Sequence, residues 1–552
     1  MIRPRWATAA RLLAAAAAAA LLVLGFNLPG SIDQLLSPWI WILPLELLLA
    51  GALALLVPVP LRRWTVRGLA LMLALLLTLR LADWLLWLVM GRPIVLIEDL
   101  PFALSLIEIG RDSMGGLPIV ALGLVALLPI ALYWLLATGV LGTVARLPRR
   151  RVVGVAVLAA AVVGELARPL GDGRPGPLWP FGRHGVQVLQ QQAERTQAAW
   201  AAAGRWTLAR GTDPVLAVPP EARLARLAGI DVVLVFVESY GRTALEAEPF
   251  RDRLRTRLGE LGAALDDAGL VAASGWLVSP TVGGQSWLAH ATLASGVRTA
   301  DQGSHAAYLG RAGGDLAHLF AAAGHRTALL SPAIVHAYPE AAGLGFQELR
   351  FADALDYAGP RPGWVTMPDQ YTLAALERLV RAERPPARPP LFATVVLVGS
   401  HAPFTPLPPL IADWDAIGDG RIYAALPLTG DSPAATWASQ AALRQAYTDA
   451  VDLSLGAVGL WAHRFVDRHT LAIVVGDHEP AALISGEPDA REVPMHVIAG
   501  DPALLEPFLA WGFTPGLVPA ATAPARPMEA FRAFFVAAFS GPTPAGRIAR
   551  LP

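Results

Sequence analysis

Four short segments of the 552-residue chain end in side chains that could perform metal-assisted chemistry. They are FVESYG with Glu238, SPTVGGQS with Ser286, VGSHAPF with His401, and VVGDHEP with Asp477 and His478. Carboxylates together with an imidazole are ligands that suit a divalent transition metal. A serine oxygen on such a metal would have a lowered pKa and could act as a nucleophile. The residue types therefore predict a metal site with an activated serine.

Each segment taken alone also has an ordinary structural interpretation. Glu238 could cap the helix that follows it, and the dipeptide DH is a common turn. Ser286 stands where a glycine-rich turn enters the apolar run SWLAHATLASG, so it could be the helix N-cap. Helix N-termini also favour anions, as a nucleophile site requires. The chemical interpretation depends on the four segments lying together in the fold.

The elements that must position these residues are strands of a parallel sheet. The runs 231–237, 269–278, 325–332, 390–399 and 470–476 are apolar and most of them end in polar residues, as buried parallel strands do. Helix patterns lie between them. This alternation predicts an α/β domain with a mostly parallel central sheet. Ligand groups gather at the carboxyl ends of the strands in such a sheet.

The first 170 residues are much more apolar than the rest. Five runs, at about 7–27, 39–58, 67–90, 117–141 and 152–168, are long enough to cross a bilayer. Arginines gather in the loops after the second and fourth runs, which the positive-inside rule assigns to the cytoplasm. We therefore expect a multi-pass membrane protein whose chain after residue 170 lies on the outer side.

Three regions follow from this organisation. They are a five-span transmembrane domain over 1–169, a linker with an amphipathic helix over 170–228, and a catalytic domain over 229–552. The segment 96–113 is expected to lie in the membrane interface. Lys+Arg and Asp+Glu both number 44, so no net charge points to a nucleic acid partner. The absence of cysteine excludes disulfides, thiolate metal sites and cysteine nucleophiles.

The outer domain resembles the alkaline phosphatase/sulfatase superfamily, and the whole arrangement resembles its lipoteichoic acid synthase-like branch of membrane transferases. The run ATLASG matches the A-x-L-x-[ST]-G ending of the sulfatase nucleophile helix, with the right spacing from Ser286 to Gly296. The proline and arginine of the sulfatase signature are missing, so conversion of Ser286 to formylglycine is not expected. The resemblance implies an alkaline phosphatase/sulfatase-like fold outside a bacterial inner membrane, on its periplasmic or extracellular side.

The resemblance also implies roles for the residues at the strand ends. Ser286 would be the nucleophile and, with Glu238, Asp477 and His478, would hold a divalent metal (Mn, Zn or Mg). His401, in the short motif GSHAPF, would contact the phosphoryl oxygens or the leaving group.

Several positions depart from the family pattern or compete with these assignments. The tryptophan and arginine that the family places upstream of GLGFQEL are missing, and His336 or Tyr338 could bind substrate in their place. His496 could approach the site or be a core histidine. Thr281 is a rival nucleophile, although its spacing to LASG does not fit. Asp369 resembles a family helix start and is expected to be structural.

The function implied is that of a metal-dependent transferase. A membrane phospholipid would donate a phosphoglycerol or phosphoethanolamine group through a covalent phosphoserine, and an envelope glycan or water would accept it. Two alternatives stay open. One is a membrane-anchored phosphatase, phosphodiesterase or sulfatase-type hydrolase, and the other is a catalytically dead module of envelope assembly.

Overall fold

Two compact units make up the chain in a computed structural model. One unit comprises Met1–Trp87 and Arg92–Ala198, and the other comprises Leu88–Gly91 and Ala199–Pro552. The structure describes residues 5–27, 43–90, 92–100, 116–146, 150–166, 181–182, 184–211, 213–310, 313–336, 338–363, 365–487 and 489–541.

Helices stand at all five positions where the sequence predicts membrane spans. They are α1 (Arg5–Phe26), α2 (Leu45–Leu56), α3 (Arg62–Met90), α5 (Gly116–Val144) and α6 (Arg150–Leu166). Within the described residues, two segments are long and apolar enough to cross a membrane, and they belong to α3 and α5. The structure thus provides two candidate spans where the sequence predicts five.

The difference is clearest at α2, which has a physical reason to be short. It has 12 residues and begins directly after Pro44, and Pro58 follows its C-cap Val57. At 1.5 Å per residue the helix is about 18 Å long, well below the roughly 30 Å of a hydrocarbon core. The apolar run in the sequence continues through these prolines, so hydropathy alone overestimates the length of the helix.

The predicted linker helix is present as α7 (His184–Gly211). Trp206 is buried and its Nε1 donates to Thr299 Oγ1 at 3.2 Å, whereas Trp200 is 68% exposed. One tryptophan therefore packs on the C-terminal unit and the other faces outward. Of the predicted interfacial segment, residues 101–113 lie outside the described residues.

The C-terminal unit contains a sheet of nine strands in the order β10-β4-β9-β8-β3-β7-β5-β6, with β11 paired to β4. Their bounds are β3 (Asp231–Val237), β4 (Val271–Val278), β5 (Arg326–Ser331), β6 (Glu348–Phe351), β7 (Leu391–Leu397), β8 (Thr470–Gly476), β9 (Glu492–Ala499), β10 (Thr514–Pro515) and β11 (Ala525–Pro527). Only the pairings of β9 and β10 are antiparallel. The predicted mostly parallel sheet is confirmed.

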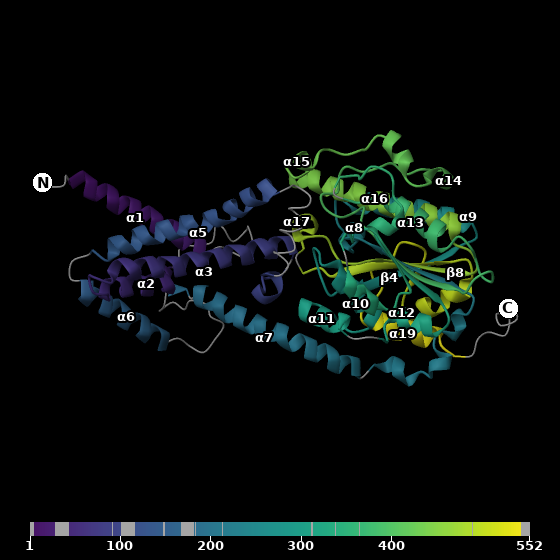
Figure 1. Ribbon diagram of the computed structural model, residues 1–552, viewed down its shortest axis with the longest axis horizontal. Helices are drawn as coiled ribbons and strands as arrows, with labels where there is room; N and C mark the ends of the chain where they lie inside the picture. Colours follow the sequence, from purple (N-terminus) through teal and green to yellow (C-terminus); the bar gives the residue numbers. More distant parts are fainter. Residues whose placement is uncertain are drawn as a thin grey trace. The chain divides into compact units, whose positions relative to one another are not determined.

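Helices pack on both faces of this sheet (Figure 1). One face carries α9 (Arg251–Asp267), α13 (Asp369–Ala375) and α16 (Gln440–Phe465), and the other carries α10 (Ser286–Ser295), α12 (Leu316–Ala322) and α19 (Ala530–Phe539). In β3, Val233 and Val235 belong to the first core, while Leu234 and Phe236 belong to the second. Because both faces are covered, every residue of β3 is buried, which explains its continuous apolar sequence.

The register of the central strands determines which residues meet at the carboxyl edge. Val237 at the end of β3 pairs with Leu397 of β7 on one side and with Gly476 of β8 on the other. Residues that follow these three strands therefore emerge side by side. Val278 at the end of β4 pairs with Glu492, so the loop before α10 leaves from the same edge.

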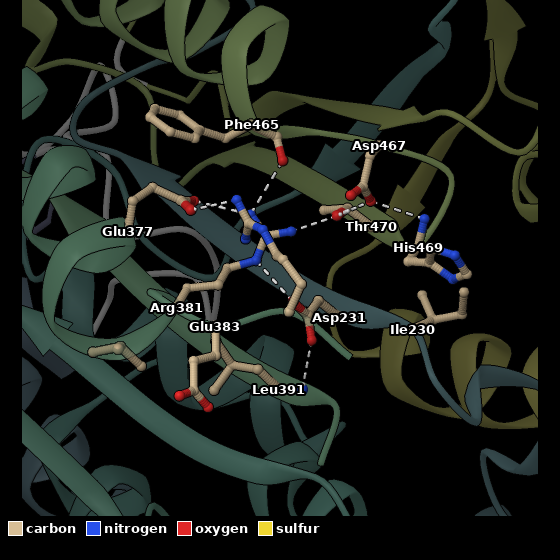
Figure 2. A network of polar contacts seen from close by, with 12 residues as sticks. Ile230, Asp231, Glu377, Arg381, Glu383, Leu391, Phe465, Asp467, His469 and Thr470 are labelled. Carbon is tan, nitrogen blue, oxygen red and sulfur yellow. Dashed lines mark hydrogen bonds and ion pairs between the residues drawn. The ribbon is translucent and has the colours of Figure 1, made fainter. Parts of the chain in front are cut away.

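A buried ionic network closes the opposite edge of the sheet (Figure 2). Asp231, at the start of β3, is 1% exposed and accepts from Arg381 Nε at 2.8 Å and from Arg388 Nη2 at 2.7 Å. Leu391 N also donates to it, at 2.9 Å, and Arg381 Nη1 donates to Glu377 at 2.9 Å. Burial alone would raise the pKa of Asp231, but the two guanidinium groups hold that pKa below its ordinary value.

Asp231→Ala is expected to lower the free energy of unfolding by about 3–5 kcal/mol, because it leaves buried guanidinium groups without their carboxylate. This stabilisation is present above the ordinary carboxyl pKa of 3.8 and is lost as the pH falls through the lower pKa of the folded protein. Denaturant unfolding of the full-length protein in detergent measures it. Asp252→Ala, at a side chain that is 80% exposed, is the control and should cost less than about 0.5 kcal/mol. Equal losses in the two variants would contradict the assignment.

Candidate active site

Ser286 lies beside Glu238, Asp477 and His478, the three residues predicted to share a metal site with it. Its Oγ donates to Glu238 Oε2 at 2.8 Å and lies 3.2 Å from His478 Nε2. His478 Nε2 is 3.2 Å from Glu238 Oε1 and 3.8 Å from Asp477 Oδ1. Ligand atoms of Glu238, Asp477 and His478 all lie within 4.8 Å of one another. The tips of β3 and β8 and the start of α10 thus bring these four side chains together.

The first turn of α10 shows that Ser286 is not the helix cap. Gln285 occupies the N-cap position with a left-handed φ of 61°, and no side chain caps the helix. Ser286 is the first helical residue, and its hydroxyl is directed at the Glu238 carboxylate. Left-handed conformations of residues other than glycine are strained and cluster at functional sites. Ser239, beside Glu238, is a second example with a φ of 55°.

The glycine-rich turn before Ser286 is bonded to the tip of β8. Ser279 Oγ donates to the Asp477 carbonyl oxygen at 2.6 Å, and Gly283 N donates to the Glu479 carbonyl oxygen at 2.9 Å. Thr281 is buried, and its hydroxyl donates to the Gly284 carbonyl oxygen at 2.8 Å. The hydroxyl of Thr281 therefore holds the turn, whereas that of Ser286 reaches the carboxylates.

The donor set fits a divalent metal ion. Asp477 Oδ1 accepts from Ser239 N at 2.8 Å and His478 N at 2.7 Å, whereas its Oδ2 is buried and has no hydrogen-bond partner among the described residues. His478 Nδ1 donates to the Glu479 carbonyl oxygen at 2.8 Å, so Nε2 is the ring nitrogen that faces the carboxylates and is available to a metal. A metal-binding histidine typically has such a backbone partner on its other nitrogen. A buried carboxylate oxygen without a partner is what a cation would satisfy.

The charges of this cluster are strongly coupled. Burial, helped by the Glu238 charge, raises the pKa of Asp477 to about 8. Burial would lower the pKa of His478, but the charges of Asp477 and Glu238 raise it to about 9. Burial would also raise the pKa of Glu238, yet His478 and Ser286 hold that pKa well below its ordinary value. Perturbed groups that gather at one sheet edge are typical of a functional site.

His401 follows β7 in a tight turn beside Glu238. Ser400 Oγ donates to the Glu238 carbonyl oxygen at 2.6 Å, and the charge of His401 helps to lower the pKa of Glu238. His401 Nδ1 donates to the Ala402 carbonyl oxygen at 2.6 Å. The structure therefore places His401 within electrostatic reach of the cluster.

His496 has the environment of a core histidine. Ser274 Oγ donates to the Gly516 carbonyl oxygen at 2.8 Å, so His496 Nδ1 donates to Ser274 Oγ, also at 2.8 Å. Its Nε2 accepts from the Tyr240 hydroxyl at 3.0 Å. Burial lowers the pKa of His496 to about 3, so it is neutral at physiological pH. Both ring nitrogens are bound by protein groups, which fits the core interpretation.

The two proposed substrate residues follow β5 at the same edge of the sheet. His336 is exposed, and the half-buried ring of Tyr338 lies 6.3 Å from that of Phe351. Among the described residues, neither side chain makes a hydrogen bond or ion pair to Ser286 or to the carboxylates. A role of His336 or Tyr338 in substrate binding stays a prediction.

Sequence reasoning missed the residues that support the cluster. Ser279, Ser400 and the main chain of Glu479 hold its members through the hydrogen bonds given above. The side chain of Glu479 is also buried, and its Oε1 accepts from Thr243 N at 3.0 Å. Each of the three lies within two residues of a predicted site residue or opens the turn before Ser286. That proximity is the only signal in the sequence that could have identified them.

Neither the family models nor the curated proteins include a match to this chain. Among solved structures, the lipoteichoic acid synthase LtaP from Listeria monocytogenes is 13% identical to this chain, with a TM-score of 0.35. The matched region covers 51% of this chain and 69% of the LtaP chain. A protein in the alkaline phosphatase superfamily from Vibrio parahaemolyticus is 15% identical, with a TM-score of 0.32, and the match covers 54% of this chain and 68% of that protein. The C-terminal periplasmic domain of EcEptC from Escherichia coli is 15% identical, with a TM-score of 0.33, and the match covers 51% of this chain and 76% of that domain. The chain is thus similar, at low identity, to solved structures from the superfamily and the branch that its sequence resembles.

Proposed function

We propose that this protein is a metal-dependent phosphotransferase of the membrane, with Ser286 as its nucleophile. The observation that carries the proposal is the Ser286 hydroxyl, 2.8 Å from a Glu238 oxygen and beside His478 and the unpartnered Asp477 Oδ2. A serine with only a structural role would not need two buried carboxylates and an imidazole around it.

Glu238, Asp477, His478 and Ser286 would hold the divalent cation, which is Mn, Zn or Mg. Such a cation, when bound, lowers the pKa of a hydroxyl and stabilises negative charge on phosphoryl oxygens. The backbone partners of Asp477 and His478 fix the directions of their ligand atoms before the cation arrives.

In the first half-reaction, Ser286 Oγ bonds to the phosphorus of a phospholipid head group, and the bond from phosphorus to the diacylglycerol oxygen breaks. The serine proton is released to water, because the lowered pKa of Glu238 makes that carboxylate an acceptor of the hydrogen bond from Ser286 and not of its proton. His401 gives a proton to the leaving diacylglycerol oxygen. The products are diacylglycerol and a phosphoserine that carries phosphoglycerol or phosphoethanolamine.

In the second half-reaction, a hydroxyl of an envelope glycan attacks the phosphoserine and releases Ser286. The serine oxygen regains a proton from water, and His401 takes the proton of the attacking hydroxyl. Ser286 and His401 therefore return to their starting states, as general acid–base catalysis requires.

The proposed location is the bacterial inner membrane, with several spans and the C-terminal unit on the periplasmic or extracellular side. The apolar segments Arg62–Leu86 and Leu127–Val144 support membrane insertion. The arginines at the N-terminus of α3, such as Arg62 and Arg63, support this orientation.

A second candidate is a hydrolase with water as the acceptor. The observation that favours it is the lack of the family's tryptophan and arginine near GLGFQEL, together with the exposed position of His336. A catalytically dead module is disfavoured because all four members of the cluster are present and in contact.

Full-length protein reconstituted with labelled phosphatidylglycerol or phosphatidylethanolamine is expected to release diacylglycerol in a metal-dependent reaction. Without an acceptor, the labelled head group should stay on the protein and map to Ser286. Cleavage of a soluble nitrophenyl phosphodiester with no release of diacylglycerol would favour the hydrolase. No turnover of any phosphoester, with metal bound, would overturn both candidates.

A further inference from the structure

Asp369 is a buried carboxylate whose hydrogen bonds, within the described structure, come from outside its own helix. It is the first residue of α13 and is 6% exposed. Its Oδ1 accepts from Val398 N at 2.9 Å and Gly399 N at 2.8 Å, and its Oδ2 accepts from Ser454 Oγ of α16 at 2.6 Å. An acidic residue that only stabilised the start of α13 would bind N–H groups of that helix.

The turn after β7 is built around this carboxylate. A Cβ atom at Gly399 would lie 2.5 Å from Asp369 Oδ2, so only glycine lets the main chain approach so closely. The Val398 carbonyl oxygen in turn accepts from His401 N at 3.1 Å. One peptide unit thus connects the Asp369 carboxylate to the backbone of His401.

The same turn also holds Glu238, because Ser400 Oγ donates to the Glu238 carbonyl oxygen at 2.6 Å. Phe404 N donates to the His401 carbonyl oxygen at 3.0 Å and closes the turn on its far side. A shift of residues 398–401 would therefore move the His401 imidazole, while the Glu238 side chain keeps its own hydrogen bonds from Ser286 and Ser239.

We propose that Asp369 is a positioning residue for the catalytic reaction, which acts by holding the turn of Val398–His401 so that His401 is presented to the reacting phosphoryl group. This inference rests on the proposed function for the role of His401. Asp369 itself touches neither substrate nor metal. Ser454, which binds its second oxygen, contributes by orienting the carboxylate.

The test compares Asp369→Asn with Asp231→Asn in the full-length protein. Both replace a buried carboxylate that accepts main-chain N–H groups, but Asp231 lies at the opposite edge of the sheet. Measured below both melting transitions, Asp369→Asn should lower kcat for a soluble phosphodiester by about 10–100-fold at unchanged metal content. Asp231→Asn should lower the melting temperature and leave kcat unchanged. Equal kcat values in the two variants would overturn the proposal.

A double-mutant cycle tests whether Asp369 acts through His401. In the His401→Ala background, Asp369→Asn should cause no further loss of kcat, because the group that it positions is already gone. Independent, multiplying losses would show that Asp369 serves the fold in general and would overturn the inference. Ser454→Ala should cause a smaller loss that also vanishes in the His401→Ala background.

Hydrogen exchange gives a readout that needs no enzyme activity. Asp369→Asn should speed amide exchange in the peptide that contains residues 398–404, and Asp231→Asn should not. If the wild-type protein turns over no phosphoester, the proposed function fails while this measurement still decides the structural link. Unchanged exchange in Asp369→Asn would overturn the inference even in an active enzyme.

Discussion

Ser286→Ala is expected to lower kcat for a phosphodiester by about four orders of magnitude or more while the protein stays folded. The substitution removes the only hydroxyl in contact with both Glu238 and His478 in the described structure. Without it no phosphoserine can form, and the remaining groups can at most orient water. Steady-state kinetics and covalent labelling with the donor lipid measure the loss, and the melting temperature reports the fold.

Thr281→Val is the matched control for that experiment. It keeps the shape of the side chain but removes the hydroxyl that donates to the Gly284 carbonyl oxygen. Loss of this bond should cost about 1 kcal/mol of stability and leave most of the activity. An inactive Thr281→Val together with an active Ser286→Ala would transfer the nucleophile to Thr281 and contradict the assignment of Ser286.

Asp477→Asn and His478→Ala are each expected to weaken metal binding by more than about 100-fold, because changes outside the first ligand sphere already cost about 10–100-fold. Asp477→Asn removes a negative charge and a ligand oxygen, and His478→Ala removes the imidazole nitrogen. Metal content after dialysis and calorimetric titration measure the effect. His469→Ala, at the opposite edge of the sheet, is the control and should retain the metal. Full occupancy in Asp477→Asn would exclude that residue from the site.

Metal affinity should also depend on pH in a defined direction. The pKa values of about 8 for Asp477 and about 9 for His478 mean that the metal-free site holds protons at neutral pH. A metal ion must displace these protons, so its affinity should rise as the pH increases through about 8 and 9, and binding should release protons. Affinity that falls over this interval would contradict a site formed by these residues.

The cluster at the sheet edge was predictable because its residues follow recognisable strands. Glu238 and Asp477 each come directly after a short, continuous apolar run, which is the pattern of a buried strand. The order of the strands was not predictable, and it is this order that places β8 beside β3. The different surroundings of the Ser286 and Thr281 hydroxyls depend on backbone angles and on the partners of each hydroxyl, which composition and spacing do not encode.

Other residues were beyond sequence reasoning because their partners lie far away in the chain. His496 is bound by Tyr240 and Ser274, which are 256 and 222 positions away. The sequence around Asp369 predicts a helix start. Its carboxylate nevertheless accepts hydrogen bonds from a turn 29 positions later and from a helix 85 positions later. Such contacts exist only once the sheet has formed, so no local sequence pattern predicts them.

The hydrogen bonds between the strand-tip loops affect how a protein with the proposed function can diverge. Ser279, Ser239 and Ser400 connect the turn before Ser286, the segments of Glu238 and Asp477, and the His401 turn through hydrogen bonds between side chains and main-chain atoms. Among the described residues, the loop after β5, with His336, makes no hydrogen bond to these groups. Under the proposed function, mutations in this loop are expected to alter which head group or acceptor is recognised without disturbing the reacting atoms. A fold arranged in this way allows new substrate preferences to evolve while its chemistry is inherited unchanged.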